Sequence, residues 1–252
     1  MNFYQAVAAN KSVTAAALPA QTSYLSTWRD PADATVGDTI VDDKTYGNYG
    51  AYSSYDNYLS GSNGAAVVDL SGTKCMYLDG VNDRAYTQNA RVSGVDNWKA
   101  TGDVDTFTEE MWVRSNGSWL SNGNFINYGY NSAWRARTNN NGTIWNYFNG
   151  GAYSTTSSLA TNTWHHLVWS VEGNGTDYVT CKIYKNGSLF HTFNNINRDP
   201  DYTAAVHFYG GYSSTSESQR MYLGVTRHYE DVALNATEVL NNYNLEKADY
   251  GY

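Results

Sequence analysis

Aromatic, guanidinium and amide side chains gather on two neighbouring segments in the middle of the chain, residues 133–138 and 143–149. A carbohydrate site needs aromatic rings on which a sugar ring can stack, with polar groups beside them that hydrogen-bond its hydroxyls. Tryptophan on a strand is more often a core residue than a platform, and the sequence does not decide which sheet face these residues occupy. The candidate carbohydrate-binding residues are Tyr128, Tyr130, Trp134, Arg135, Trp145 and Tyr147.

A short oxygen-rich turn follows a predicted strand near residue 80. Asp79, Asn82 and Asp83 supply carboxylate and amide oxygens, which hard cations such as calcium prefer as ligands. The same residue types are common in turns because they hydrogen-bond their own backbone. No EF-hand spacing occurs, so a calcium site here would also need ligands from separate loops. The sequence requires no cofactor, and calcium is the candidate metal.

Two pairs of adjacent residues resemble catalytic or metal-binding groups, but their spacing argues against both roles. Glu109 and Glu110 are neighbours on a predicted strand, and so are His165 and His166. Successive strand residues point to opposite faces, so neither pair can act on one substrate or chelate one ion. We expect the glutamates at a solvated strand edge and the histidines in packing and hydrogen bonds.

The two cysteines, Cys75 and Cys181, both fall in predicted strands. Alternation places Cys181 on the inner side of its strand together with Val179 and Ile183. Two buried reduced thiols and a single disulfide are both compatible with this pattern.

Composition indicates an all-β protein. The 252 residues include 23 Tyr, 8 Trp and 22 Gly, and only 16% are charged, a composition typical of sheets and turns. The net charge of -8 provides no basic surface for phosphate contacts, so we expect no nucleic-acid partner. No apolar run is long enough to cross a membrane, and the first 20 residues lack the features of a signal peptide, so we expect no membrane insertion and no cleavage.

Residues 162–187 carry the most definite local pattern. An apolar strand over 164–171 leads to a Gly-Asn-Gly turn, a second strand covers 178–184, and Asn186-Gly187 closes a further hairpin. Further strands with turn signals between them predict two antiparallel sheets. The expected strands are residues 65–70, 74–80, 84–89, 106–115, 124–130, 133–138, 143–149, 164–171, 178–184, 188–193, 205–211 and 220–229.

One helix is predicted near the C-terminus. Asn235 is a suitable N-cap, Glu238 completes a capping box, and Leu234 with Val239 forms a hydrophobic staple. The expected apolar stripe of this helix consists of Val239, Leu240 and Tyr243.

Five segments in one order resemble the laminin G-like branch of the concanavalin A-like lectin and glucanase superfamily. They are residues 77–87 (YLDGVNDRAYT), 105–115 (DTFTEEMWVRS), 162–174 (NTWHHLVWSVEGN), 181–190 (CKIYKNGSLF) and 222–244 (YLGVTRHYEDVALNATEVLNNYN). The resemblance implies an all-β, two-sheet antiparallel jelly-roll sandwich with one short C-terminal helix. We expect this domain over 65–252, preceded by an extended N-terminal arm, residues 1–64, rich in Tyr, Asn, Gly and Ser.

Similarity to this superfamily leaves several functions open, since its members include sugar-binding modules, adhesion domains, calcium-binding domains and phage or viral surface proteins. Its retaining glucanases resemble one another in a Glu-x-Asp-x-(x)-Glu strand, which this chain lacks although it contains seven Glu. We therefore expect no enzymatic activity, and glycoside hydrolysis is the less favoured hypothesis.

The leading hypothesis from the sequence is a virion surface protein, such as a phage or viral capsid decoration, fibre or cement protein. It would bind host or environmental glycans, and the arm of residues 1–64 would contact other virion subunits in an oligomeric assembly. The alternative is a free carbohydrate-binding module or adhesin located outside the cell or at a cell surface.

Overall fold

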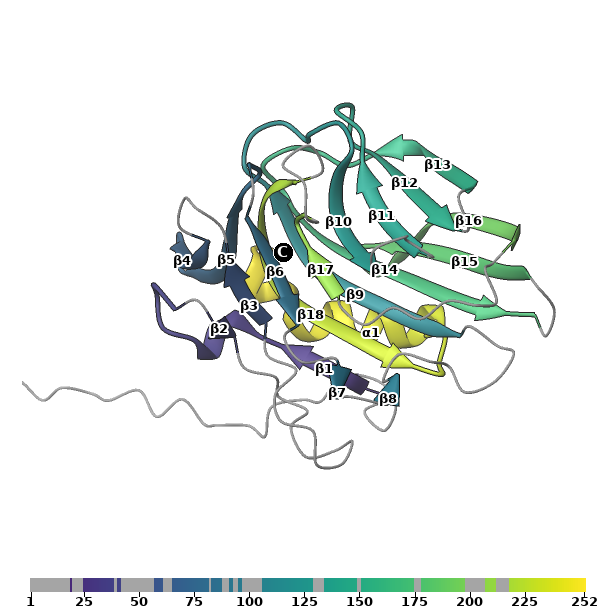
Figure 1. Ribbon diagram of the computed structural model, residues 1–252, viewed down its shortest axis with the longest axis horizontal. Helices are drawn as coiled ribbons and strands as arrows, with labels where there is room; N and C mark the ends of the chain where they lie inside the picture. Colours follow the sequence, from purple (N-terminus) through teal and green to yellow (C-terminus); the bar gives the residue numbers. More distant parts are fainter. Residues whose placement is uncertain are drawn as a thin grey trace, which may run out of the picture.

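Two antiparallel sheets of eight strands each face one another in the computed structural model (Figure 1). The structure describes residues 19, 25–38, 40–41, 57–60, 65–81, 83–87, 91–92, 95–96, 106–128, 134–148, 151–174, 178–197, 207–211 and 218–252. The strand order is β16-β15-β14-β9-β18-β5-β4 in sheet A, with β1 also paired to β18, and β13-β12-β11-β10-β17-β6-β3-β2 in sheet B. The expected two-sheet antiparallel sandwich is confirmed.

The strands of sheet A are β1 (Leu25–Arg29), β4 (Ala66–Leu70), β5 (Thr73–Asp79), β9 (Phe107–Ser115), β14 (Trp164–Gly173), β15 (Tyr178–Lys185), β16 (Ser188–Asn197) and β18 (Arg220–Glu230). Those of sheet B are β2 (Ile40–Val41), β3 (Asn57–Ser60), β6 (Arg84–Thr87), β10 (Gly123–Tyr128), β11 (Trp134–Thr138), β12 (Thr143–Phe148), β13 (Gly151–Ser158) and β17 (His207–Tyr209). A separate ribbon pairs β7 (Arg91–Val92) with β8 (Val95–Asp96). Among the described residues the helical elements are η2 (Pro31–Asp33), α1 (Ala236–Glu246) and η4 (Lys247–Tyr250).

The main hydrophobic core lies between the two sheets and follows the alternation of the strands. In sheet A, Met111 of β9 opposes Leu167 of β14, and both side chains are buried in this core. In sheet B, Trp134 of β11 opposes Phe148 of β12 in the same core. Burial of a large apolar side chain contributes about 1.5–3 kcal/mol, so these inward positions dominate the stability of the sandwich.

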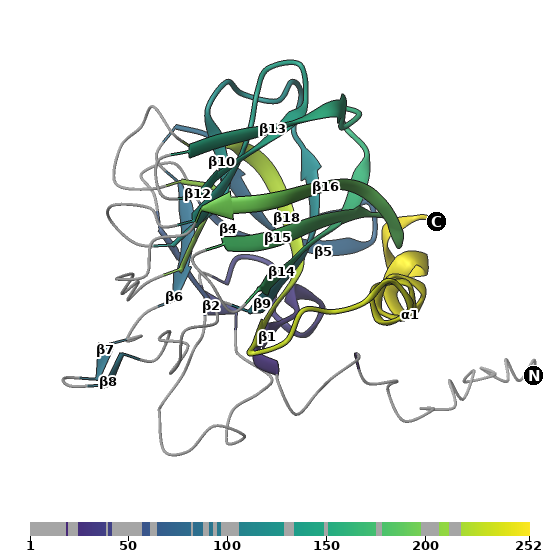
Figure 2. The ribbon, with the colours of Figure 1, turned by 90° about the vertical axis from the view of Figure 1, so that its right-hand side faces the viewer.

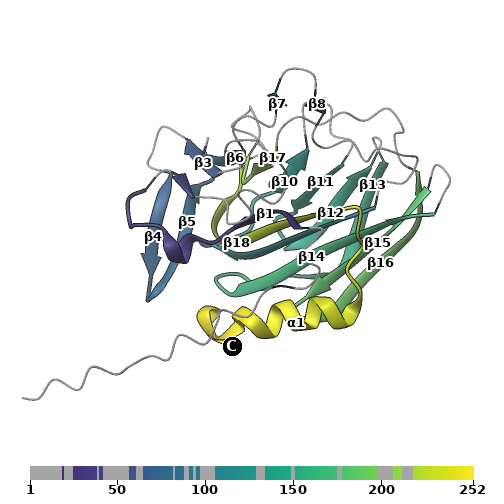
Figure 3. The same cartoon turned by 90° about the horizontal axis from the view of Figure 1, so that it is seen from below.

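Helix α1 covers the outer face of sheet A and runs alongside β14, β15 and β16 (Figure 3). Its N-terminus is confirmed as expected, because Asn235 accepts hydrogen bonds from the backbone of Thr237 and Glu238 in a complete capping box. The expected apolar stripe is only partly right. Leu240 is 43% exposed, and the buried residues of the helix are Val239, Asn242 and Glu246.

The boundary expected at residue 64 does not separate an arm from the sandwich. In the described part of residues 1–64, β1 pairs with β18 and β3 pairs with β6, so this segment contributes strands to both sheets. The turn at residues 35–38 also covers β4, since Gly37 N donates to Val67 O and Val67 N donates to Asp38 O, each at 2.8 Å. These strands were not predicted from the sequence, because the segment is rich in polar residues.

Strand β13 was missed by the sequence prediction because its residues, GAYSTTSS, lack an apolar alternation. It forms the free edge of sheet B next to β12.

Both cysteines are free and buried, so the disulfide alternative is wrong. They lie in separate clusters, because Cys181 belongs to the core between the sheets and Cys75 packs with Trp112 on the outer side of sheet A. Burial raises the pKa of Cys75 to about 12. No helix among the residues that the structure describes is long and apolar enough to cross a membrane.

Candidate functional site

The register between β11 and β12 sorts the candidate carbohydrate-binding residues onto two faces of sheet B. Arg135 opposes Tyr147 and Arg137 opposes Trp145, whereas Trp134 opposes Phe148 one residue away. Trp134 and Phe148 lie in the core, so alternation places Arg135, Arg137, Trp145 and Tyr147 on the outward face. We call these four residues the Arg–aromatic cluster.

Cation–π contacts hold the Arg–aromatic cluster together. The guanidinium carbons of Arg135 and Arg137 lie 4.4 and 5.0 Å from the ring centroid of Tyr147. The rings of Trp145 and Tyr147 have centroids 6.2 Å apart. Such contacts each contribute about 0.5–1 kcal/mol at exposed sites and fix the orientation of the planar groups.

On one side, the Arg–aromatic cluster lies next to β13. Ser154 opposes Trp145 and Ala152 opposes Tyr147, and both β13 residues are exposed. Trp145 and Tyr147 are themselves half-buried, so parts of both side chains reach solvent. The cluster therefore combines accessible aromatic surface with hydrogen-bond donors, the two features that sugar binding needs.

Trp134 needs a correction, because its side chain is only 3% exposed. It packs against Phe107 and Trp169 between the sheets, with ring centroids 5.3 and 6.1 Å away, and cannot serve as a stacking platform. Tyr128 is the last residue of β10, where its Cα opposes His207. Tyr130 lies outside the described residues.

The six candidate residues do not include Arg137, which lies in the same predicted hairpin, or Asn124, which was not predicted as part of the site. Arg137 is 5% exposed, and its Nε donates a hydrogen bond of 2.9 Å to Oδ1 of Asn124 on β10. The alternation of β11 places Arg137 on the same face as Arg135, and this signal was available in the sequence.

The turn at Asp79 and Asp83 is held by its own backbone contacts. Oδ1 of Asp79 accepts from Val81 N at 2.8 Å, and Oδ2 of Asp83 accepts from Asp79 N at 3.0 Å. Asp83 is buried, and this burial raises the pKa of its carboxyl group. Asn82 lies outside the described residues, and within the described part of the chain no three His, Cys, Asp or Glu residues cluster as metal ligands.

Glu109 and Glu110 are both fully buried, so the expectation of a solvated strand edge is wrong. They do face opposite sides of β9, as alternation predicts. Inside the sandwich, Glu109 accepts a hydrogen bond of 2.7 Å from the hydroxyl of Tyr209 on sheet B, and Nδ1 of His228 lies 2.9 Å from its other oxygen. This carboxylate therefore links the two sheets across the core.

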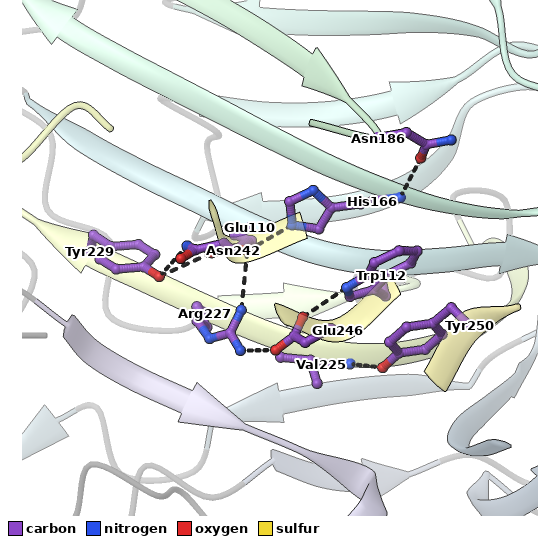
Figure 4. Close-up of polar contacts among 10 residues, drawn as sticks. All are labelled: Glu110, Trp112, His166, Asn186, Val225, Arg227, Tyr229, Asn242, Glu246 and Tyr250. Atoms are coloured by element: carbon purple, nitrogen blue, oxygen red, sulfur yellow. Dashed lines mark hydrogen bonds and ion pairs between the residues drawn. The ribbon is translucent and has the colours of Figure 1, made fainter. Parts of the chain in front are cut away.

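Glu110 lies under helix α1 at the centre of a buried polar network (Figure 4). Its carboxylate contacts His166 Nε2 at 2.7 Å and Arg227 Nη1 at 3.1 Å, and accepts from the hydroxyl of Tyr229 at 3.0 Å and from Asn242 Nδ2 at 2.9 Å. Burial alone would raise the pKa of Glu110, but the charge of Arg227 and the bonds from His166 and Tyr229 lower it to about 2.

Glu246 extends this network from the helix to sheet A. It forms an ion pair with Arg227 and accepts a hydrogen bond of 2.8 Å from Trp112 Nε1. The network fixes the position of α1 and is enclosed by the helix, so it offers no access to a ligand.

The paired histidines are structural, as expected. Nε2 of His165 lies 3.0 Å from Ala160 O, while His166 points to the opposite face and contacts Glu110. Burial lowers the pKa of His165.

Residues 87–239 match the model of a family described as the concanavalin A-like lectin/glucanases superfamily. The chain belongs to this superfamily. The match covers more than half of the sequence, and it includes the Arg–aromatic cluster and most of the buried network. A search among curated proteins finds no match.

Several solved structures are similar to this chain in fold. Domain 4 of AbnA, a GH43 extracellular arabinanase from Geobacillus stearothermophilus solved in complex with arabinotriose, is 16% identical with a TM-score of 0.60, over 87% of this chain and 98% of that domain. The receptor-binding domain of botulinum neurotoxin type G is 14% identical with a TM-score of 0.57, over 88% of this chain and 51% of that one.

A mutant of Trypanosoma rangeli sialidase displaying trans-sialidase activity is 14% identical with a TM-score of 0.62, over 92% of this chain and 34% of that enzyme. This chain thus spans about half of the length of the toxin domain and about a third of the length of the sialidase chain. At these identities the similarity establishes the shared fold, which is found in both binding domains and enzymes.

Proposed function

We propose that the protein is a non-enzymatic glycan-binding module that binds sugars on the outward face of sheet B and is displayed on the surface of a virion. The observation that carries the glycan-binding proposal is the Arg–aromatic cluster. Trp145 provides a partly exposed ring. Ser154 lies opposite it on β13, and Arg135 lies diagonally from it on β11, opposite Tyr147, so a hydroxyl and a guanidinium provide hydrogen-bond donors near the ring. A sugar ring stacked on Trp145 would reach both groups.

The proposal of a non-enzymatic role rests on the surroundings of the carboxylates on β9. Hydrolysis of a glycosidic bond by the usual route needs two accessible carboxyl groups on one face. Glu109 and Glu110 are fully buried, point to opposite faces and are each engaged by other side chains. Neither is placed to reach a sugar on the outward face of sheet B.

Similar structures support binding as the function. The arabinanase domain was solved with arabinotriose, and the neurotoxin domain is a receptor-binding domain. The role that these structures support for this chain is recognition of a ligand outside the cell.

Display on a virion is proposed from the sequence of residues 1–64, whose Tyr-rich composition suits contacts with other subunits of an oligomeric assembly. Immunogold labelling of purified particles from the source would test this location. Label on intact particles supports it. A protein found only free outside cells or on a cell surface would favour the alternative of a free carbohydrate-binding module or adhesin.

We also propose a calcium ion beside Asp83. Oδ1 of Asp83 and Oγ of Ser218 are buried without hydrogen-bond partners among the described residues. Both residues adjoin Gly211, Ser218 through Oγ and Asp83 through its backbone oxygen. A cation would compensate these two oxygens, with Asp79 and Asn82 as nearby candidates for further ligands. Isothermal titration of the chelator-treated protein with calcium tests the site, and Asp83→Asn should abolish any heat of binding.

Binding of the intact chain to a glycan array tests the main proposal. We expect Trp145→Ala and Tyr147→Ala to lose binding. Tyr222→Ala is the matched control, because Tyr222 lies in sheet A with Arg114 over its ring at 5.7 Å and should be irrelevant to the ligand. Equal losses in all three variants, or no bound glycan at all, would refute the assignment of the site.

A further inference from the structure

The charges of this protein are distributed unevenly along the chain. The sequence has 24 Asp and Glu residues and a net charge of -8, yet residues 111–171 contain no acidic residue. The charged side chains in that segment, apart from histidines, are those of Arg114, Arg135 and Arg137. A positively charged segment is therefore embedded in an acidic protein.

The fold concentrates part of this positive charge on one surface. Strands β10, β11, β12 and β13 all fall within the acid-free segment and lie side by side in sheet B. Arg135 and Arg137 lie on the outward face of β11, and the next strands present Trp145, Tyr147 and Ser154. Figure 2 labels three of these strands, β10, β12 and β13. An anionic ligand on the outward face would meet no carboxylate from the four strands, because their sequences contain none.

The two guanidinium groups have different roles in this arrangement. Arg137 is 5% exposed and bonded to Asn124, so it supplies fixed positive charge beneath the surface. Arg135 is half-buried, with its guanidinium carbon 4.4 Å from the centroid of the Tyr147 ring, so part of its side chain reaches solvent. A guanidinium held in one plane presents N–H donors in a fork that matches a carboxylate or sulfate group.

We propose that the outward face of sheet B selects acidic saccharides, with Arg135 contacting the anionic group and Trp145 stacking on the sugar ring. This inference rests on the proposed glycan binding and specifies its ligand class. The acidic remainder of the protein disfavours anions elsewhere, so the positive face determines where such a ligand approaches. Attraction between exposed charges falls with salt, and binding should therefore weaken as ionic strength rises.

The test uses the intact chain and three oligosaccharide probes of equal length in calorimetric titrations. Tetragalacturonate carries carboxylates, a heparin-derived tetrasaccharide also carries sulfates, and galactotetraose is neutral. We expect at least one acidic probe to bind about tenfold or more tightly than the neutral probe, as for a charge-assisted hydrogen bond. Its affinity should fall several-fold between about 50 and about 500 mM salt. Screening of the charges is weak at the lower concentration and strong at the higher one.

Variants assign the preference to a residue. Arg135→Gln should remove the preference for the acidic probe, and Arg135→Lys should retain part of it because the charge remains while the fork is lost. Arg114→Gln is the matched control, because Arg114 also lies over a tyrosine ring but belongs to sheet A. Far-ultraviolet circular dichroism of each variant verifies the fold.

The outcomes separate this inference from the proposed function. Binding of the neutral probe as tight as that of both acidic probes overturns the acidic preference and leaves glycan binding intact. An acidic preference that survives Arg135→Gln, or that disappears equally in Arg114→Gln, overturns the role of Arg135. Failure of every probe, together with an empty glycan array, refutes both proposals.

Discussion

Tyr250 stacks on Trp112 with ring centroids 4.1 Å apart and an angle of 11° between the planes. The hydroxyl of Tyr250 also accepts a hydrogen bond of 2.9 Å from Val225 N. The turn η4 is thereby attached to the outer face of sheet A beyond the end of α1.

Replacing Tyr250 by Ala should destabilise the whole domain. Loss of a buried aromatic side chain costs about 3–5 kcal/mol, and Val225 N would lose its partner as well. Urea unfolding monitored by tryptophan fluorescence would measure the change. Tyr252→Ala serves as the control, since Tyr252 is 46% exposed and its loss should cost far less.

Gly224→Ala should be destabilising through the same tyrosine, because a Cβ at this position collides with the Tyr250 hydroxyl and with two carbons of its ring. We expect a cost of about 1–3 kcal/mol in the free energy of unfolding. The cost should shrink by about 1 kcal/mol in a Tyr250→Ala background, where the hydroxyl and the ring are both absent. Fully additive effects in this double-mutant cycle would contradict the proposed collision.

The low pKa of Glu110 predicts a specific loss of stability in acid. Its folded-state pKa of about 2 lies below the unfolded value, so its contribution is present above about pH 4.3 and is lost as the pH falls towards 2. The shift corresponds to on the order of 3 kcal/mol. The gap in unfolding free energy between wild type and Glu110→Gln should be full at about pH 7 and narrower at about pH 3, where part of the contribution is lost. Glu172→Gln, at an exposed position of β14, should show no comparable change.

The two tryptophans of the candidate site should respond in opposite ways. Trp134→Ala removes a core side chain and should cost about 3–5 kcal/mol of stability. Trp145→Ala, on the outward face, should cost about 1 kcal/mol or less while removing ligand binding. Thermal unfolding and glycan binding measured on the same samples would distinguish the two. Equal destabilisation by both variants would place Trp145 in the core and contradict its role as a platform.

The strands with apolar alternation and the capped helix could be predicted because their signals are local. Asn235 and Glu238 specify a helix start within four residues, and Asn186-Gly187 specifies a tight turn in which both residues have positive φ. Strand β13 could not be found this way, because its Ser and Thr residues are positioned by pairing with β12.

The burial of the glutamates on β9 depended on partners far away in the sequence. Glu110 looked solvated beside Glu109, but it meets Arg227 and Asn242, more than 100 residues later. A buried charge is tolerated when such partners surround it. No local sequence pattern predicts partners that lie so far away along the chain. Alternation along the strands predicts that the candidate site residues lie on two faces of the sheet. The register of β11 and β12 was needed to show which of the two faces is outward.

The two thiols lie in different layers of the protein, so the labelling of each one can detect the separation of its own layer. Cys181 lies between the sheets and Cys75 lies beneath the C-terminal turn, and burial raises the pKa of both thiols. Reaction with a thiol reagent needs the ionised and accessible form, so each cysteine remains inert until its own layer separates. The order in which the two become labelled therefore reports whether the C-terminal turn detaches before the sheets part.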